Sequence, residues 1–145
     1  MAVYTKVSRD ELTAFLRDYD VGALVDFRGI ASGVENSNYF VETTAGRFIL
    51  TLFEKRANPA ELPYFLNLMT HLHRKGVVCP QTVAAADGAP LRVLNGKKAC
   101  LTTFLNGASV FDVTPEHCAQ LGTAMARLHL AGADYAGFRK NDLSV

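Results

Sequence analysis

The stretch Gly29-Ile30-Ala31-Ser32-Gly33-Val34-Glu35-Asn36-Ser37-Asn38-Tyr39 decides how this sequence is interpreted, together with its flanks. An apolar run over residues 22–27 precedes it and an alternating run over residues 39–43 follows, so the pattern predicts two strands joined by a glycine-bearing loop. Backbone N–H groups approach an anion closely where side chains are short or absent, so such a loop can lie over a nucleotide's phosphates. Most Gly/Ser/Asn clusters between strands are only turns, and the rest of the chain must decide.

The residues on either side of this loop predict a helix and a further strand. Ser8-Arg9-Asp10-Glu11 has the pattern of a capping box, and apolar residues then recur at helical spacing: Leu12, Phe15, Leu16 and Tyr19. From residue 22 to residue 55 the apolar period is two. The run Phe48-Ile49-Leu50-Thr51-Leu52-Phe53 follows the turn Thr44-Ala45-Gly46-Arg47 and is apolar on both faces, which indicates a central, covered strand.

A second helix and more strands are predicted after residue 57. Asn58, Pro59 and Glu61 form a helix start with Asn58 as the N-cap, and Gly76 ends the helix. Its apolar stripe consists of Leu62, Phe65, Leu66, Met69 and Leu72. We expect residues 82–86 to pair with residues 90–94, and residues 90–94 to pair with residues 97–104 through Asn95-Gly96, the dipeptide that best suits a type I′ hairpin.

The last helix runs from Thr114-Pro115-Glu116 to Gly132, with Cys118, Leu121, Met125 and Leu128 on one face. The predicted order is helix, three strands, helix, two or three strands, helix. Hairpins dominate the connections and few of them suit a right-handed parallel crossover. The sequence therefore predicts an α+β fold on a mostly antiparallel sheet of about five strands with one packed helix.

Composition limits the classes of partner. The 145 residues carry a net charge of +1, which gives no electrostatic case for nucleic acid or an anionic membrane as a partner. Cys79, Cys100 and Cys118 are odd in number and lack CxxC spacing, so they are interpreted as reduced thiols. The first residues contain no apolar signal core, and no run approaches 18 uninterrupted apolar residues. We expect a cytoplasmic protein.

Four segments carry a resemblance to a known family: Gly-Val-Glu-Asn-Ser-Asn-Tyr (33–39), Phe-Ile-Leu-Thr-Leu-Phe-Glu-Lys-Arg (48–56), Leu-Thr-Thr-Phe-Leu-Asn-Gly (101–107) and Ala-Arg-Leu-His-Leu-Ala-Gly-Ala-Asp (126–134). Together they resemble the bacterial homoserine kinases of the protein-kinase-like superfamily that includes aminoglycoside phosphotransferases and choline kinases. The resemblance implies a nucleotide-binding small lobe over residues 1–105, with a hinge at residues 102–105. It also implies that residues 106–145 are the incomplete start of the helical larger lobe.

The resemblance assigns the phosphates of ATP to the glycine loop, which comprises Ser32, Gly33, Val34, Glu35, Asn36 and Ser37. Thr51 stands where relatives place the lysine that holds the α- and β-phosphates, which is a departure from the pattern. Lys55 lies on the same strand face and is the nearest replacement, or else a solvated lysine at a strand end.

Two further roles follow from the resemblance. Glu61 stands where the family's lysine-pairing glutamate is expected, and the capping box with Asn58 is an equally supported alternative. The hinge would meet adenine through its backbone, with the Thr103 carbonyl accepting from the exocyclic amine and the Leu105 N–H donating to the ring.

The predicted activity is transfer of the γ-phosphoryl group of ATP to a small hydroxyl substrate, with L-homoserine favoured over choline and aminoglycosides. Chemistry of this class needs an aspartate at the acceptor hydroxyl and side chains that hold Mg²⁺. No histidine here is followed two residues later by aspartate, so we expect the catalytic residues and metal ligands outside this chain.

The alternative is a non-catalytic nucleotide-binding or interaction module. By the resemblance to the kinase family, the last helix packs inside the larger lobe in relatives, so its apolar stripe would lose much of its cover in this chain, and self-association through this helix is also expected.

Overall fold

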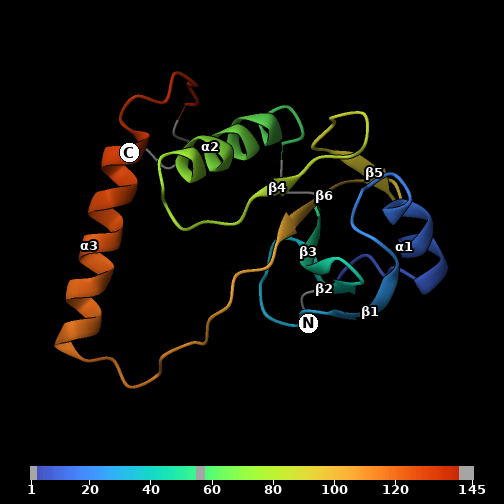
Figure 1. The fold of residues 1–145 in the computed structure, drawn as a ribbon, viewed down its shortest axis with the longest axis horizontal. Helices are drawn as coiled ribbons and strands as arrows, with labels where there is room; N and C mark the ends of the chain where they lie inside the picture. Colours follow the sequence, from blue (N-terminus) through green and yellow to red (C-terminus); the bar gives the residue numbers. More distant parts are fainter. Residues whose placement is uncertain (1–2, 55–57, 141–145) are drawn as a thin grey trace.

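The computed structural model describes residues 3–54 and 58–140 and contains three helices and six strands in that part of the chain. Figure 1 shows the sheet beside α1 at one end of the molecule and α3 at the other. The elements, in chain order, are α1 (Arg9–Leu16), β1 (Leu24–Gly29), β2 (Ser37–Thr43), β3 (Gly46–Leu52), α2 (Leu62–Arg74), β4 (Thr82–Val83), β5 (Arg92–Leu94), β6 (Lys97–Thr103) and α3 (Pro115–Gly132).

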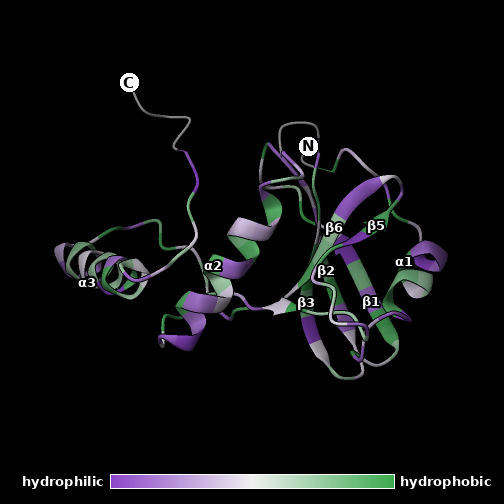
Figure 2. Cartoon of the chain, turned by 90° about the horizontal axis from the view of Figure 1, so that it is seen from above, coloured by the Kyte–Doolittle hydropathy of each residue, from purple (hydrophilic) through white to green (hydrophobic). Residues whose placement is uncertain are grey.

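The six strands form one antiparallel sheet in the order β1-β2-β3-β6-β4, with β5 also paired to β6. The α+β, antiparallel fold class is therefore confirmed. Strand β3 lies between β2 and β6, so its predicted central position is correct. Figure 2 shows that α1 covers one face of the sheet, that α2 covers the other, and that α3 lies beyond α2.

The hydrophobic core lies between α1 and the sheet. Alternation along β3 sends Leu50 and Leu52 into this core, where both are fully buried, and leaves Thr51 on the opposite face. Helix α1 begins with the predicted capping box: the Ser8 hydroxyl accepts from the Glu11 N–H, and the Glu11 carboxylate accepts from the Ser8 N–H. The side of the sheet that faces away from α1 is thereby left for α2 and for a site.

Helix α2 begins at Leu62, three residues later than the predicted first helical residue Pro59. Asn58 does not cap it: the Asn58 side-chain oxygen accepts from the Ala60 N–H, and the Glu61 N–H donates to the Asn58 carbonyl, so residues 58–61 form a turn. The helix starts at Leu62, with Pro63 in its first turn. Proline suits that position because its missing N–H would have no partner inside the helix.

The predicted pairing of residues 82–86 with residues 90–94 is wrong. Strand β4 pairs with Leu101 and Thr102 of β6, and β5 pairs farther along the same strand. The intervening chain instead makes a tight turn in which the Ala85 N–H donates to the Ala89 carbonyl, and the Ala86 N–H is bound by Asp18 at the end of α1. The pairing of β5 with β6 is confirmed.

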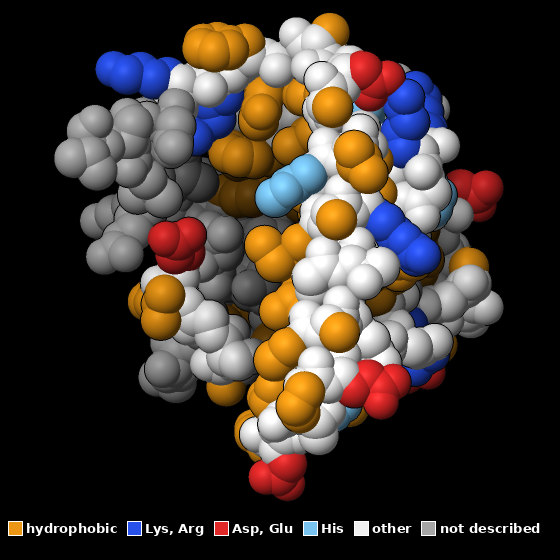
Figure 3. Space-filling view, turned by 90° about the vertical axis from the view of Figure 1, so that its left-hand side faces the viewer, with side chains coloured by type: hydrophobic (Ala, Val, Ile, Leu, Met, Phe, Trp, Pro, Cys, Tyr) orange, Lys and Arg blue, Asp and Glu red, His pale blue; other side chains and the backbone are white. Residues whose placement is uncertain are grey.

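Helix α3 begins at the predicted cap, where the Thr114 hydroxyl accepts from the His117 N–H. It packs by its C-terminal end against α2, where His71 Nε2 lies 2.9 Å from the Ala131 carbonyl and the Tyr135 hydroxyl donates to the Tyr64 carbonyl. None of its residues is buried. Figure 3 shows hydrophobic side chains following the helix along one side, so the predicted apolar stripe is exposed.

The division into lobes at residue 105 stays a prediction. Among the described residues, no helix has both the length and the apolarity that a membrane crossing requires. All three cysteines are free thiols.

Candidate functional site

The glycine loop spans residues 30–36 between β1 and β2 and is open to solvent. Ser32, Gly33, Val34 and Glu35 are exposed, and their N–H groups donate to no other residue in the described ranges. Gly33 has φ +114°, a conformation that residues with a side chain rarely adopt. The loop therefore presents unused backbone donors, which is the property that binding of an anion requires.

Asn36 and Ser37 play a different part from the rest of the predicted phosphate loop. The Ser37 hydroxyl is fully buried and is hydrogen-bonded to the N-terminal segment and to Glu54. The Asn36 side-chain oxygen accepts from the Glu54 N–H at 3.3 Å. These two side chains anchor the base of the loop, and the tip at Ser32–Glu35 is the part that is open to a ligand.

A cavity of about 250 Å³ lies between the sheet and α2. Its lining residues come from β3, β6, α2 and their flanks: Thr51, Phe53, Leu62, Phe65, Leu66, Met69, Pro80, Cys100 and Thr102. Ligand sites for drug-sized molecules occupy about 300–1,000 Å³, so this cavity suits a flat aromatic group rather than a whole nucleotide. Burial raises the pKa of the Cys100 thiol to about 12, so the wall of the cavity is uncharged there.

The sheet face that lines the cavity relates it to the base of the glycine loop and to the predicted hinge. Thr51 lies opposite Asn38 of β2, and the Thr51 hydroxyl donates to the Asn38 side-chain oxygen at 2.8 Å. Asn38 follows the loop by two residues. At the other end the lining residue Thr102 is the first residue of the predicted hinge. One sheet face thus joins the loop, the Thr51 position and the hinge.

The hinge is held on one side and open on the other. The Thr103 N–H donates to the Gln81 carbonyl at 2.9 Å, and the Thr103 hydroxyl accepts from the Gln81 N–H at 3.0 Å. The Phe104 N–H donates to the Arg47 carbonyl at 3.1 Å. No described residue accepts from the Leu105 N–H, and the Leu105 side chain is partly exposed. The Leu105 N–H is therefore a donor that a ligand at the predicted hinge could use.

The predicted cation for the phosphates stays a prediction. Thr51 faces the cavity and carries no charge, whereas Lys55 lies outside the described residues. Glu61 is bound by Arg139 and by the Asn58 amide, and the hydrogen bond from Arg139 lowers the pKa of Glu61. The Arg139 guanidinium also lies over the Phe65 ring, 5.3 Å from its centroid. Glu61 therefore pairs with a cation from the end of the chain, which neither sequence interpretation anticipated.

Several residues at the site gave no signal in the sequence. Asn38 lies in the segment that carries the resemblance, but neither Asn38 nor Cys100 was assigned a role, because a single polar or thiol residue in a strand indicates no function alone. Glu54 was missed for the same reason, although strand alternation would have placed its neighbour Phe53 on the Thr51 face. In the described ranges no group of three His, Cys, Asp or Glu side chains converges on a possible metal site.

Comparison with known proteins identifies the family. The sequence model of the phosphotransferase enzyme family matches residues 26–144. The chain belongs to this family. It is 57% identical over its whole length to the homoserine kinase of Xanthobacter autotrophicus and 58% identical over 99% of its length to that of Acidiphilium cryptum. The chain spans 45% of the length of each of these curated relatives.

Two solved structures share the fold. A microcompartment-associated aminopropanol kinase superimposes with a TM-score of 0.73 and 22% identity, over 94% of this chain and 45% of that one. A spectinomycin phosphotransferase in complex with ADP and spectinomycin gives 0.69 and 14% identity, over 88% of this chain and 39% of that one. The resemblance found in the sequence, and with it the kinase-like small-lobe fold, is confirmed.

Proposed function

We propose that the protein containing this chain transfers the γ-phosphoryl group of ATP to the hydroxyl oxygen of L-homoserine, releasing ADP. The observation that carries the proposal is the sheet face on which the Thr51–Asn38 pair follows the glycine loop and the cavity extends to Thr102 of the predicted hinge. The names of the curated relatives, at 57% and 58% identity, support homoserine as the acceptor.

In this proposal the chain binds and orients the nucleotide. Adenine enters the cavity between β3, β6 and α2, where the Thr103 carbonyl and the Leu105 N–H pair with its edge. The phosphates then lie against the exposed N–H groups of residues 32–35. Positioning and electrostatic stabilisation supply nearly all of the catalysis in phosphoryl transfer, so a fixed adenine and a fixed loop are a direct contribution to rate.

In this proposal the Thr51–Asn38 pair lies between the adenine in the cavity and the phosphates at the glycine loop. It offers polar atoms without a positive charge, so the cation for the α- and β-phosphates comes from another residue, and Lys55 is our candidate. Mg²⁺ would neutralise charge on the β- and γ-phosphates. The described residues do not supply a set of ligands for it, and we place those ligands, like the acceptor base, outside this chain.

The test is a phosphorylation assay on the complete gene product with L-homoserine, choline and an aminoglycoside as acceptors. We expect the largest kcat/KM for homoserine. Faster turnover of choline or the aminoglycoside would reject homoserine as the substrate and keep the phosphotransferase assignment. We propose the cytoplasm as the location, consistent with the three free thiols.

A further inference from the structure

Glu54 is a nearly buried carboxylate two residues after the end of β3, and none of the roles above uses it. Its side chain is only 11% exposed. One carboxylate oxygen accepts from the Thr5 hydroxyl at 2.6 Å and from the Ser37 hydroxyl at 2.8 Å, and the other lies 3.0 Å from Lys97 Nζ. The carboxylate thus joins the N-terminal segment, the start of β2 and the start of β6.

Ser37 transmits this network to the glycine loop. Its hydroxyl oxygen accepts from the N–H groups of Tyr4 and Thr5, at 2.8 and 2.9 Å, while its proton is donated to Glu54. The Asn36 side chain accepts from the backbone N–H of Glu54 itself. Two consecutive residues at the end of the loop are therefore bound to Glu54: Ser37 binds its carboxylate, and Asn36 binds its backbone N–H.

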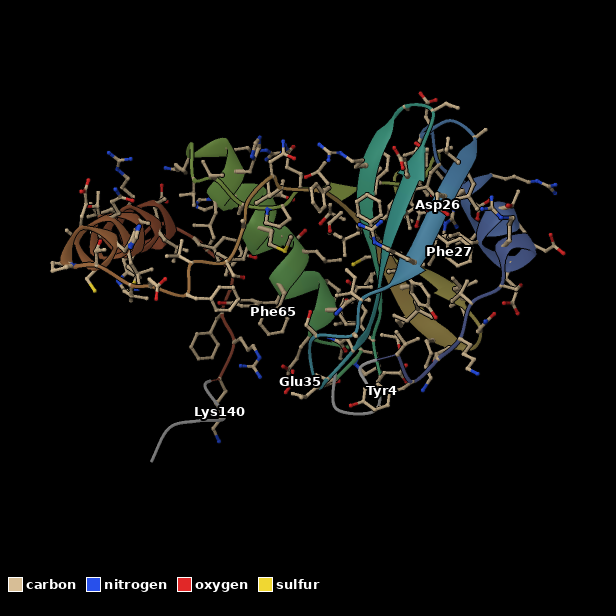
Figure 4. The ribbon with its side chains drawn as sticks, turned by 90° about the horizontal axis from the view of Figure 1, so that it is seen from below. Tyr4, Asp26, Phe27, Glu35, Phe65 and Lys140 are labelled. Atoms are coloured by element: carbon tan, nitrogen blue, oxygen red, sulfur yellow. The ribbon has the colours of Figure 1, made fainter. Side chains whose placement is uncertain are left out.

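The N-terminal segment lies across the base of the loop and reaches its tip. The Tyr4 hydroxyl donates to the Val34 carbonyl at 3.0 Å. The Tyr39 hydroxyl accepts from the Val7 N–H and donates to the Thr5 carbonyl, which ties the same segment to β2. Figure 4 shows Tyr4 and Glu35 at the same end of the sheet, with Asp26 at the opposite end.

The hydrogen bonds to Glu54 keep its carboxylate charged, which strengthens its hold on the loop. Burial alone would favour its neutral acid, but the donors Thr5, Lys97 and Ser37 together lower its pKa, so the carboxylate is ionised at neutral pH. Hydrogen bonds to an ionised carboxylate are about twice as strong as neutral ones. The exposed residues 32–35 lack hydrogen bonds through their own N–H groups among the described residues, so their order depends on the two ends of the loop.

We propose that Glu54 is a positioning residue for phosphate binding, holding the conformation of residues 32–36 through Ser37 and Tyr4 without touching the nucleotide. This inference rests on the proposed function, because it takes the phosphates to lie against the loop. Adenine meets the cavity and the hinge, whereas only the phosphates meet the loop. Loss of Glu54 therefore weakens binding of ATP and leaves binding of adenosine, which has no phosphates, unchanged.

The experiment is calorimetric titration of the purified protein with ATP and, separately, with adenosine. Glu54→Ala is expected to weaken ATP binding by at least about tenfold and adenosine binding by less than about twofold. Glu54→Gln retains one acceptor but not the charge toward Lys97, so its ATP affinity lies between those of the wild type and the alanine variant. Tyr4→Phe removes one hydrogen bond to the loop and weakens ATP binding by about two- to tenfold.

Asp26→Asn is the matched control, because Asp26 is an exposed strand carboxylate paired with Arg9 at 3.7 Å at the far end of the sheet. It should change neither affinity. Folded Glu54 variants that bind ATP like the wild type, or that lose ATP and adenosine equally, would overturn the inference alone. If Glu54→Ala does not fold, Tyr4→Phe decides, because the Tyr4 side chain is 58% exposed and its ring is retained.

In the complete gene product, the same variants should raise the KM for ATP and leave the KM for homoserine unchanged. A wild type that binds neither ATP nor adenosine would reject the proposed function, and the inference with it.

Discussion

Replacing Gly33 by alanine places a side chain at a position whose φ is +114°. A residue with a Cβ in such a sparsely populated conformation is strained by about 1–3 kcal/mol. The loop tip can escape this strain by changing shape, because none of its N–H groups donates to another described residue. We therefore expect the cost in ATP binding, as a decrease in affinity of about 5- to 150-fold, rather than in the free energy of unfolding.

Calorimetric titration with ATP and urea denaturation of the same samples measure the two quantities separately. Gly88→Ala is the matched control: Gly88 has φ +83° in the turn before β5, with no atom within 4 Å of an added Cβ. It should lower the free energy of unfolding by about 1–3 kcal/mol and leave ATP affinity unchanged. The reasoning is refuted if Gly33→Ala binds ATP like the wild type, or if Gly88→Ala weakens ATP binding equally.

Three further predictions concern stability and association. Ser37→Ala removes the acceptor of two backbone N–H groups and should lower the free energy of unfolding by about 2–4 kcal/mol in urea denaturation, whereas a loss below about 0.5 kcal/mol would contradict the network. Burial raises the pKa of Cys100 from 9.0 to about 12, so the contribution of its neutral thiol to the free energy of unfolding is complete below pH 9 and is lost as pH rises toward 12, by at most about 1.4 kcal/mol per pH unit. Cys100→Ala should therefore reduce the fall of the free energy of unfolding between about pH 9 and pH 10, and an unchanged pH dependence would refute this prediction. The isolated 145-residue chain should self-associate through α3, where Leu121 and Leu128 are exposed; sedimentation should show a lower mean mass after Leu121→Glu, and a monodisperse wild-type monomer would argue against it.

Local signals in the sequence predicted those parts of the fold that neighbouring residues determine. The Ser8–Glu11 capping box forms as expected. The Asn95-Gly96 hairpin has positive φ at both residues, 49° and 73°, as a type I′ turn requires. The central place of β3 followed from its two apolar faces. Each of these features depends on residues close together in the chain, so the sequence alone was enough to predict it.

The remaining features depend on partners far along the chain. Strand β4 pairs with β6, and the segment after β4 is held by the Asp18 carbonyl, far away in sequence, which accepts from the Ala86 N–H. Helix α2 begins at Leu62 because Pro63, not Pro59, occupies its first turn. The local sequence does not distinguish Pro59 from Pro63 as the proline of the first helical turn.

The candidate site shows the same division. The loop and Gly33 were visible because glycine and small polar residues cluster there. Glu61 binds Arg139, 78 residues away, and Glu54 binds Thr5, 49 residues away, so neither pair has a local signature. The sequence predicted the loop, including Asn36 and Ser37, whereas the contacts of Glu54 and the N-terminal segment that anchor its base emerged only from the fold.

Hydrogen–deuterium exchange with and without a non-hydrolysable ATP analogue tests the site most directly, because it reports on individual backbone N–H groups. We predict slower exchange at residues 32–36 and at Leu105 when the analogue is bound, and no change in the turn at residues 85–89. Binding without slower exchange at either the loop or Leu105, or with the change confined to another part of the chain, would contradict the proposed nucleotide site.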